Sequence, residues 1–578
     1  MYTIVIILES DVGQPEGGLS QGSGSLRLFN VGKYSNLTMI DDSDSPLSDS
    51  SEPPAKKSRG TVNILNVRVV SVLDKCKISS RDAVHLIIAI ADALGHKVDT
   101  LIVNASSIHR YREKIREAKA AHIKEVFKNM EFDSLVVHWD GKMLYNMVKH
   151  EVLDRLPILV SNNEIEKLIG IPELSDRTGK SQAEAICEVL EDWGLSDQVK
   201  ALSCDTTPSN FGIKKGAAYL VEKSLERDIL FLPCRHHMFE LVIKSVFEEF
   251  MPKSTGPNVA LFKNFQKIWP EIDQTKFKSG LLDNKVNRIL SSRAEEVNLF
   301  IEDIYKSSYL PRGDYRELLE LSQIFLGKIP SRGIKFKYPG ASSHARFMSK
   351  TIYCLKIFIF RDCFELDSEE LESLREICIF NIDVYLEVWF TCPFALSAPN
   401  NDLKFLKKLK NYESISPKVS EITLKKFQNH LWYLNPESAA LAFFDKTISD
   451  DMKKKMVLAL VKMDTSNKSK RFLIKIPKDK PKEESESVYL KDIDYFINKR
   501  SSNFFKRFNI NEAFLKTDPS TWKNNKDFIS AYDKIKTLRV TNDIAERGVK
   551  LVEDYNNILT TNENQKQYLL QLIKEYVQ

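Results

Sequence analysis

The sequence predicts an α/β core that is interrupted by a long helical segment and preceded by a shorter helical one. Three observations predict this class in the 578 residues. Apolar runs of strand length alternate with helical patterns over residues 131–250, strand signals mostly vanish over 251–530, and the final 50 residues are again amphipathic helix. The predicted units are a tail (1–60), a helical N-terminal segment (61–130), the first part of the core (131–250), a helical insertion (251–530) and a C-terminal helix that completes the core (531–578).

The tail is rich in Ser, Gly, Pro and Asp and has few large apolar residues. Such a composition buries too little surface to offset the entropy of ordering, so it predicts disorder. The tail ends in PPAKKSRG, where Lys56, Lys57 and Arg59 stand together. This cluster predicts a nuclear import signal and hence a nuclear protein. A solubilising run of charge is the alternative.

The helical N-terminal segment carries a basic cluster. One helix is expected from a cap at Ser80 to Gly95, and a second from about Ser106. Clustered cations release counterions from DNA, so the second helix is a candidate for phosphate contact. The candidate residues are Arg110, Arg112, Lys114, Arg116 and Lys119. The alternative is a solvated helix face, partly neutralised by Glu113 and Glu117.

The core begins with recognisable buried strands. Strands are expected at Phe132–Trp139, Leu156–Val160, Val199–Cys204 and Ile229–Pro233. Ser181 with Glu184 three residues later predicts a capping box that opens a helix. The strands alternate with helices, which predicts a layered α/β arrangement.

Two acidic residues end two of these strands. Asp140 follows LVVHW and Asp205 follows VKALSC. Carboxylates at neighbouring strand ends can converge on a hard cation such as Mg²⁺ (or Mn²⁺), and two such ions can activate an attacking oxygen and stabilise a leaving oxygen of a phosphodiester. An Asp after a strand is also a common turn former, so a third acid is needed to raise this pair above chance.

The sequence around these acids resembles the hAT superfamily of DDE-type DNA transposases. The resemblance rests on LSCDTTPSNFG, on FLPCRHHMFELVI with its C-x-x-H pair Cys234 and His237, and on VTNDIAERGVKLVEDYN near the C-terminus. It implies an RNase H-like (retroviral-integrase-type) core, a helical insertion before the last catalytic helix, and cut-and-paste movement of DNA. It also implies an assembly of several copies, since two DNA ends are handled together.

The resemblance makes Glu546 the third acid beside Asp140 and Asp205, and all three would hold the metal. On a helical wheel Glu546 falls just past the edge of the stripe formed by apolar residues such as Ile544 and Leu551, as expected for a group facing a cleft. Glu437 in LWYLNPESAALAFF is the competing candidate. Cys234 and His237 are interpreted as packing and positioning groups beside the site, because too few further ligands stand near them for a zinc centre.

Other features limit the possible functions. The 84 Lys and Arg exceed the 79 Asp and Glu only slightly, so overall charge does not argue for nucleic acid. Eight scattered cysteines without CxxC pairs favour a reducing compartment, and no apolar run of membrane-spanning length is present. Cys76 is the only cysteine in the first 130 residues, so the BED-type zinc finger of many relatives cannot form there. A catalytically inactive, domesticated transposase that binds DNA or protein is therefore the alternative function.

Overall fold

The structure is a computed structural model that describes residues 65–542. Residues 77, 99–100, 102, 147–150, 163–164, 252–258, 308–309, 311–312, 341–347, 464–468 and 475–486 within that range are not described. The predicted tail with Lys56, Lys57 and Arg59 lies outside the described residues, as does most of the predicted C-terminal helix, including Glu546.

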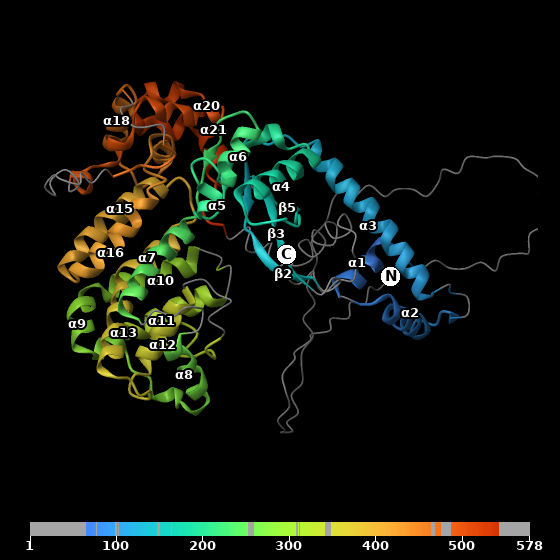
Figure 1. The fold of residues 1–578 in the computed structure, drawn as a ribbon, viewed down its shortest axis with the longest axis horizontal. Coiled ribbons are helices and arrows are strands. Elements are labelled where there is room, and N and C mark those ends of the chain that lie inside the picture. The colour runs from blue at the N-terminus through green and yellow to red at the C-terminus, as the bar shows by residue number, and fades with distance from the viewer. Residues whose placement is uncertain are drawn as a thin grey trace, which may run out of the picture. The chain divides into compact units, whose positions relative to one another are not determined.

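The core is built on a mixed five-stranded sheet with the order β5-β4-β1-β6-β7. The central strand β1 (Leu135–Trp139) pairs antiparallel with β4 (Ile158–Asn162) and parallel with β6 (Val199–Ser203). At the two ends, β5 (Ile165–Gly170) pairs antiparallel with β4, and β7 (Leu230–Phe231) pairs parallel with β6. Two further strands, β2 (Lys142–Asn146) and β3 (Glu151–Arg155), form a separate antiparallel pair between β1 and β4 in the sequence. Figure 1 shows the strands and helices in chain order.

Helices cover both faces of the sheet. Side chains alternate between the two faces along each strand, so neighbouring residues of one strand pack against different helices. Val137 and Trp139 of β1 join an apolar cluster with α4 (Gly179–Asp192) and α6 (Ala217–Ser224). Val136 joins a second cluster, which contains α7 (Arg235–Phe250) and the insertion. All five residues of β1 are buried, which explains why the strand reads as a continuous apolar run.

The N-terminal helices have a small core of their own. α1 (Val67–Lys75), α2 (Ser80–Ala93) and α3 (Ala105–Lys128) pack through Leu65, Leu73, Ala83, Ile87 and Ile108. At the end of α3, Phe127 contacts Phe132 and Trp193, with ring centroids 5.2 and 5.7 Å away. The predicted helices are therefore present, although α2 is capped by Ser79 rather than Ser80.

Residues after α7 are helical wherever the structure describes them, apart from turns and connections. The α-helices are α8 (Ala260–Ile268), α9 (Asn284–Leu290), α10 (Ala294–Ser307), α11 (Gly313–Phe325), α12 (Met348–Ile359), α13 (Ser368–Phe380), α14 (Leu386–Thr391), α15 (Ala398–Asn411), α16 (Pro417–Phe427), α17 (Pro436–Ala439), α18 (Asp450–Ala459), α20 (Ser502–Arg507) and α21 (Lys526–Ile535). This agrees with an α/β core that carries a helical insertion. A short π-helical segment over Asn381–Tyr385 lies between α13 and α14.

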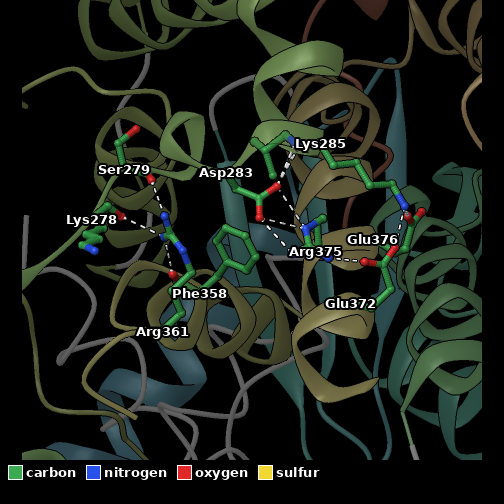
Figure 2. A network of polar contacts seen from close by, with 10 residues as sticks. Lys278, Ser279, Asp283, Lys285, Phe358, Arg361, Glu372, Arg375 and Glu376 are labelled. Carbon is green, nitrogen blue, oxygen red and sulfur yellow. Dashed lines mark hydrogen bonds and ion pairs between the residues drawn. The ribbon is translucent and has the colours of Figure 1, made fainter. Parts of the chain in front are cut away.

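Figure 2 shows a polar network that joins α9 to α13 inside the insertion. Asp283 caps α9 by accepting from the backbone N–H groups of Lys285 and Val286, and its carboxylate also accepts from Arg375 at 2.9–3.0 Å. Lys285 bridges Glu372 and Glu376. The Asp283 carboxylate thus stabilises the start of α9 and also joins α9 to α13 through Arg375.

A buried ion pair ties the insertion to the core. Arg235 at the start of α7 donates to Asp402 of α15, and both side chains are 0% exposed. Arg235 also donates to the carbonyl of Cys392 at 3.0 Å, and the Tyr433 hydroxyl donates to the carbonyl of Pro233 at 2.7 Å. The insertion is therefore joined to the core by polar contacts as well as by apolar packing.

The predicted helix cap at Ser181 is also corrected. The helix after residue 177 begins at Gly179 and is capped by Thr178, whose hydroxyl accepts from the Ser181 N–H, so Ser181 is not the cap. Among the described helices, none is long and apolar enough to cross a membrane.

Candidate active site

The two predicted aspartates end adjacent parallel strands. In the pairing of β1 with β6, His138 lies opposite Ser203. Asp140 and Asp205 each follow two residues later, so continuing this register sets them level at one edge of the sheet. Both side chains are half-buried. Parallel strands present their carboxyl ends at the same edge, so Asp140 and Asp205 both follow strands that end on the same side of the sheet.

One of the two carboxylate oxygens of Asp205 accepts hydrogen bonds within a turn. Oδ1 accepts from the Thr207 N–H at 3.0 Å, the Thr207 hydroxyl at 2.7 Å and the Asn210 amide at 2.6 Å. No hydrogen bond reaches Oδ2 from the residues that the structure describes. Asp273 and Asp445 form the same turn with Thr275 and Thr447. The turn is thus a recurrent local structure, and what distinguishes Asp205 is its place beside Asp140.

A hydrogen-bonded chain connects the ends of the two strands. The Trp139 indole N–H donates to the Asn210 side-chain oxygen at 2.9 Å, and the Asn210 amide donates to Asp205. Trp139 is 0% exposed and directly precedes Asp140. Asn210 therefore couples the residue next to one acid to the carboxylate of the other.

Cys234 lies beside this edge. Its N–H donates to the Cys204 carbonyl at 2.8 Å, which extends the pairing of β6 with β7 beyond the strands. Burial raises the pKa of the Cys204 thiol well above its ordinary value, and Asp205, Cys234 and Asp140 raise it further. The electrostatic influence of both aspartates on one thiol agrees with their proximity. The prediction for Cys234, a positioning group beside the acids, fits these contacts.

His237 is directed toward the insertion. It is half-buried, and burial lowers the pKa of His430 to about 4, with His237 lowering it further. His430 belongs to the 3-10 turn Gln428–His430, which follows α16. The structure brings Cys234 into contact with the residues around the acids, and it places His237 near His430.

The described chain ends against the same edge of the sheet. The Asn542 N–H donates to the Cys234 sulfur at 3.1 Å, and its side-chain amide donates to the Trp139 carbonyl at 2.9 Å. Just before it, the Val540 carbonyl accepts from the Arg235 N–H at 2.8 Å. Asn542 is 4% exposed. Glu546, four residues further on, lies outside the described residues, and its role stays a prediction.

Glu437, the competing third acid, is bound to an arginine. It lies in α17 and is 4% exposed. Its Oε1 accepts from Nε of Arg507 at 2.7 Å and from Nη2 at 2.5 Å. Two N–H groups of the guanidinium thus share one oxygen of Glu437, and the carboxylate has a structural role because its buried charge is compensated.

A metal site with three ligands is not complete in residues 65–542. No group of three or more His, Cys, Asp or Glu side chains gathers there in a way that could hold an ion. Asp140 and Asp205 are hard oxygen ligands of the type that Mg²⁺ prefers, so they fit two of the expected positions.

The predicted DNA-contacting face of helix α3 is corrected in part. Arg112 and Arg116 are only 4% and 6% exposed, and both pair with the buried Asp74, at 3.3 and 2.7 Å. Burial lowers the pKa of Arg112. These two arginines are structural groups between α1 and α3, so they do not form an exposed phosphate-contacting face. Arg110 and Lys114 are exposed and Lys119 is half-buried, and their DNA contact stays a prediction.

Sequence reasoning missed two of the residues that organise the site. Asn210 stands in the TTPSNFG run after Asp205, where a side-chain amide is a common turn group without a distinctive pattern. Asn542 sits two residues after Val540, more than 300 residues from its partner Cys234, and no local spacing reports such a contact.

Comparisons with known proteins do not assign the chain to a family. No family model and no curated protein matches the chain. Among solved structures, the Drosophila P element transposase strand transfer complex matches at a TM-score of 0.23 and 10% identity, covering 64% of this chain and 93% of that one. Identity and score are too low to place the chain in a family.

Proposed function

We propose that this protein is a DDE-type DNA transposase of the hAT-like kind, with an RNase H-like core, that hydrolyses and rejoins phosphodiesters. The observation that carries the proposal is the register of β1 against β6, which sets Asp140 level with Asp205. The strand order supports it too, because an RNase H-like sheet has three antiparallel strands followed by two that run parallel to the first.

The third acid in this proposal is Glu546. Asn542 binds Cys234 and the carbonyl of Trp139, so the chain leaves the described region directly beside Asp140. A helix continuing from there would carry Glu546 about one turn beyond Asn542. Glu437 is the weaker choice because Arg507 already neutralises it.

Asp140, Asp205 and Glu546 would hold Mg²⁺ (or Mn²⁺). The ion would supply charge stabilisation for the attacking and leaving oxygens of the phosphodiester. Within the chain, Asn210 and the Thr207 N–H fix the orientation of Asp205 and leave Oδ2 to accept a ligand. Trp139 and Asn542 fix the backbone before Asp140.

We further propose that the protein acts as a homo-oligomer in the nucleus. Joining two DNA ends in one event requires more than one catalytic core, and the Lys56–Arg59 cluster provides a signal for import. Exposed cations of α3, such as Arg110 and Lys114, would contact DNA.

A cleavage assay tests the chemistry. The substrate is a plasmid carrying the genomic sequence that flanks the coding region, with Mg²⁺ or Mn²⁺, and DNA binding is verified first. Asp205→Asn is expected to reduce cleavage roughly 100-fold or more. Asp445→Asn is the matched control, because Asp445 accepts from Thr447 and Asn400 much as Asp205 does from Thr207 and Asn210.

Equal cleavage by wild type and Asp205→Asn would contradict the catalytic proposal. Tight DNA binding without any cleavage in either metal would favour the alternative, a domesticated DNA- or protein-binding regulator that has kept the shape of a transposase.

A further inference from the structure

The helical insertion contains a stretch whose charged residues are all positive. Residues 321–361 include eight Lys or Arg and no Asp or Glu. With 79 acids in 578 residues, a stretch of this length would carry about five or six at the chain's average. The stretch begins within α11 and ends just after α12. Between these helices the structure describes an irregular segment, residues 327–340, which we call the strap.

Two cations near the ends of the strap and of the stretch stabilise the insertion itself. Lys328 is bound to Glu302 at 2.6 Å. Arg361 donates to the carbonyl of Ser279 at 3.1 Å (Figure 2). These two charges therefore have structural roles, and a role for the other cations has to come from the strap.

Polar side chains of neighbouring helices hold the backbone of the strap. Gln266 of α8 donates to the carbonyls of residues 339 and 340, at 2.8 Å each. Lys356 of α12 donates to the carbonyl of Lys337 at 2.8 Å. Lys356 is 1% exposed, and Glu317 compensates its charge at 2.5 Å. A buried lysine is costly to desolvate, and here it fixes one conformation of the strap.

Apolar side chains alternate with cations in the strap. Ile334 and Phe336 are half-buried and pack against the core of the insertion. The Phe336 ring lies 5.8 Å from the ring of Phe277 and 4.8 Å from the ring of Phe360, measured between centroids. Lys335, between Ile334 and Phe336, is exposed. The apolar residues thus attach the strap to the insertion and leave its cationic side chains in solvent.

Three cations of the strap are exposed, namely Arg332, Lys335 and Lys337. None of the three forms an ion pair with another residue that the structure describes. The Lys337 ammonium donates to the carbonyl of Gly313 at 3.0 Å, which leaves its charge unchanged.

The carboxylates beside the strap are few. Glu302 and Glu317 form the ion pairs described above. Glu320 lies near Arg332, because both act on the same hydroxyl: burial raises the pKa of Tyr305, Glu320 raises it further and Arg332 lowers it. An ordered surface with clustered, exposed cations favours an anionic partner.

We propose that the strap binds the phosphate backbone of double-stranded DNA. Cations that neutralise phosphates release condensed counterions, and this contribution does not depend on the base sequence. Phosphate contacts position a protein on a duplex, whereas base contacts in the grooves give specificity. The fixed backbone of the strap lowers the entropic cost of binding, because the segment is ordered before DNA arrives. The inference rests on the proposed function, which makes DNA the anionic partner.

Binding without cleavage tests the inference. Fluorescence anisotropy with the full chain in EDTA measures the Kd of a labelled duplex of arbitrary sequence at several salt concentrations. For Arg332→Gln with Lys335→Gln, we expect the Kd at 0.1 M salt to rise roughly tenfold or more, and the slope of log K against log salt to become shallower by about 1.8, as for two lost phosphate contacts. Lys337 is left in place because it also binds the Gly313 carbonyl.

A matched control removes two exposed charges elsewhere in the insertion. Lys404→Gln with Lys425→Gln changes α15 and α16, where both lysines are exposed. This variant should bind the duplex with nearly the Kd of the wild type. The melting temperature of each variant verifies that it is folded, as expected for substitutions of exposed side chains.

Three outcomes would overturn the inference. One is an equal Kd for the strap and control variants, and a second is an unchanged salt slope for the strap variant. A third is displacement of the duplex by polyglutamate at the same charge concentration, which would assign the strap to acidic peptides. Since EDTA removes the metal, this measurement is independent of the cleavage assay. DNA binding through the strap without cleavage would contradict the catalytic proposal alone, and cleavage with unchanged binding by the strap variant would contradict this inference alone.

Discussion

The buried pair Arg235–Asp402 makes a quantitative prediction about how the insertion is attached. Replacing Arg235 by Met keeps an unbranched side chain at this position but removes the guanidinium, whose Cζ lies 5.0 Å from the centroid of the Phe239 ring. Asp402 is then left buried without its partner, which costs roughly 3–5 kcal/mol at pH 7. The side chains are 0% exposed, so solvent does not screen the loss.

The cost depends on pH because Asp402 can be protonated. In the wild type, burial raises the pKa of Asp402 to about 6, with Arg235 opposing the shift. Loss of Arg235 raises that pKa above 7, so the folded variant binds a proton that the unfolded chain does not bind. A folded pKa above the unfolded one gives stability that increases as pH falls. Between pH 7 and 6 the folded variant should gain about 1.4 kcal/mol from this proton, whereas the wild type, half protonated at pH 6, gains about 0.4 kcal/mol. The difference in stability between the two should therefore shrink by about 1 kcal/mol.

Below pH 6 the wild type also takes up this proton, and the difference should level off. Urea unfolding followed by tryptophan fluorescence at pH 7, 6 and 5 measures these values. Lys306→Met is the control, since its pair with Asp303 is largely exposed and should contribute less than about 1 kcal/mol. A loss below 1 kcal/mol for Arg235→Met at pH 7, or a loss independent of pH, would refute the reasoning.

Three further predictions concern single contacts. Gly179→Ala should destabilise the protein by about 1–3 kcal/mol, because a Cβ there would lie 2.2 Å from the Lys215 carbonyl, and a thermal-shift assay should show no comparable loss for Gly340→Ala, which has open space. Arg116→Ala should lower the melting temperature strongly, whereas Lys114→Ala should weaken DNA binding at unchanged stability; the reverse pattern would return Arg116 to the DNA-contacting face. Asn542→Ala should reduce cleavage about 10- to 100-fold with little loss of stability, as for groups that orient metal ligands, and an unchanged rate would remove its positioning role.

The sequence indicated the buried strands more clearly than the exposed ones. β1 and β6 are almost fully buried and read as apolar runs, so their ends, and hence Asp140 and Asp205, could be located. β5 was not predicted because only its second half is buried. β2 and β3 were not predicted either, and they pair with each other outside the main sheet. A strand without a continuous apolar run lacks the pattern on which strand prediction depends.

A long-range contact and a choice between two neighbouring caps account for two further errors. Arg112 and Arg116 have the spacing of a basic helix face, and only Asp74, on another helix, turns them into buried groups. The capping position near residue 180 was misplaced because Thr178 and Ser181 are both good caps, and only the structure distinguishes them.

The contact between Asn542 and Trp139 has a consequence for synthesis of the protein. Its partners are 403 residues apart. At the usual speed of translation, roughly 20–80 s separate the emergence of the first partner from that of the second. During that interval the nascent chain already contains both aspartates but not the segment that packs against them. A ribosome that stops early would therefore release a sheet whose acidic edge is unfinished.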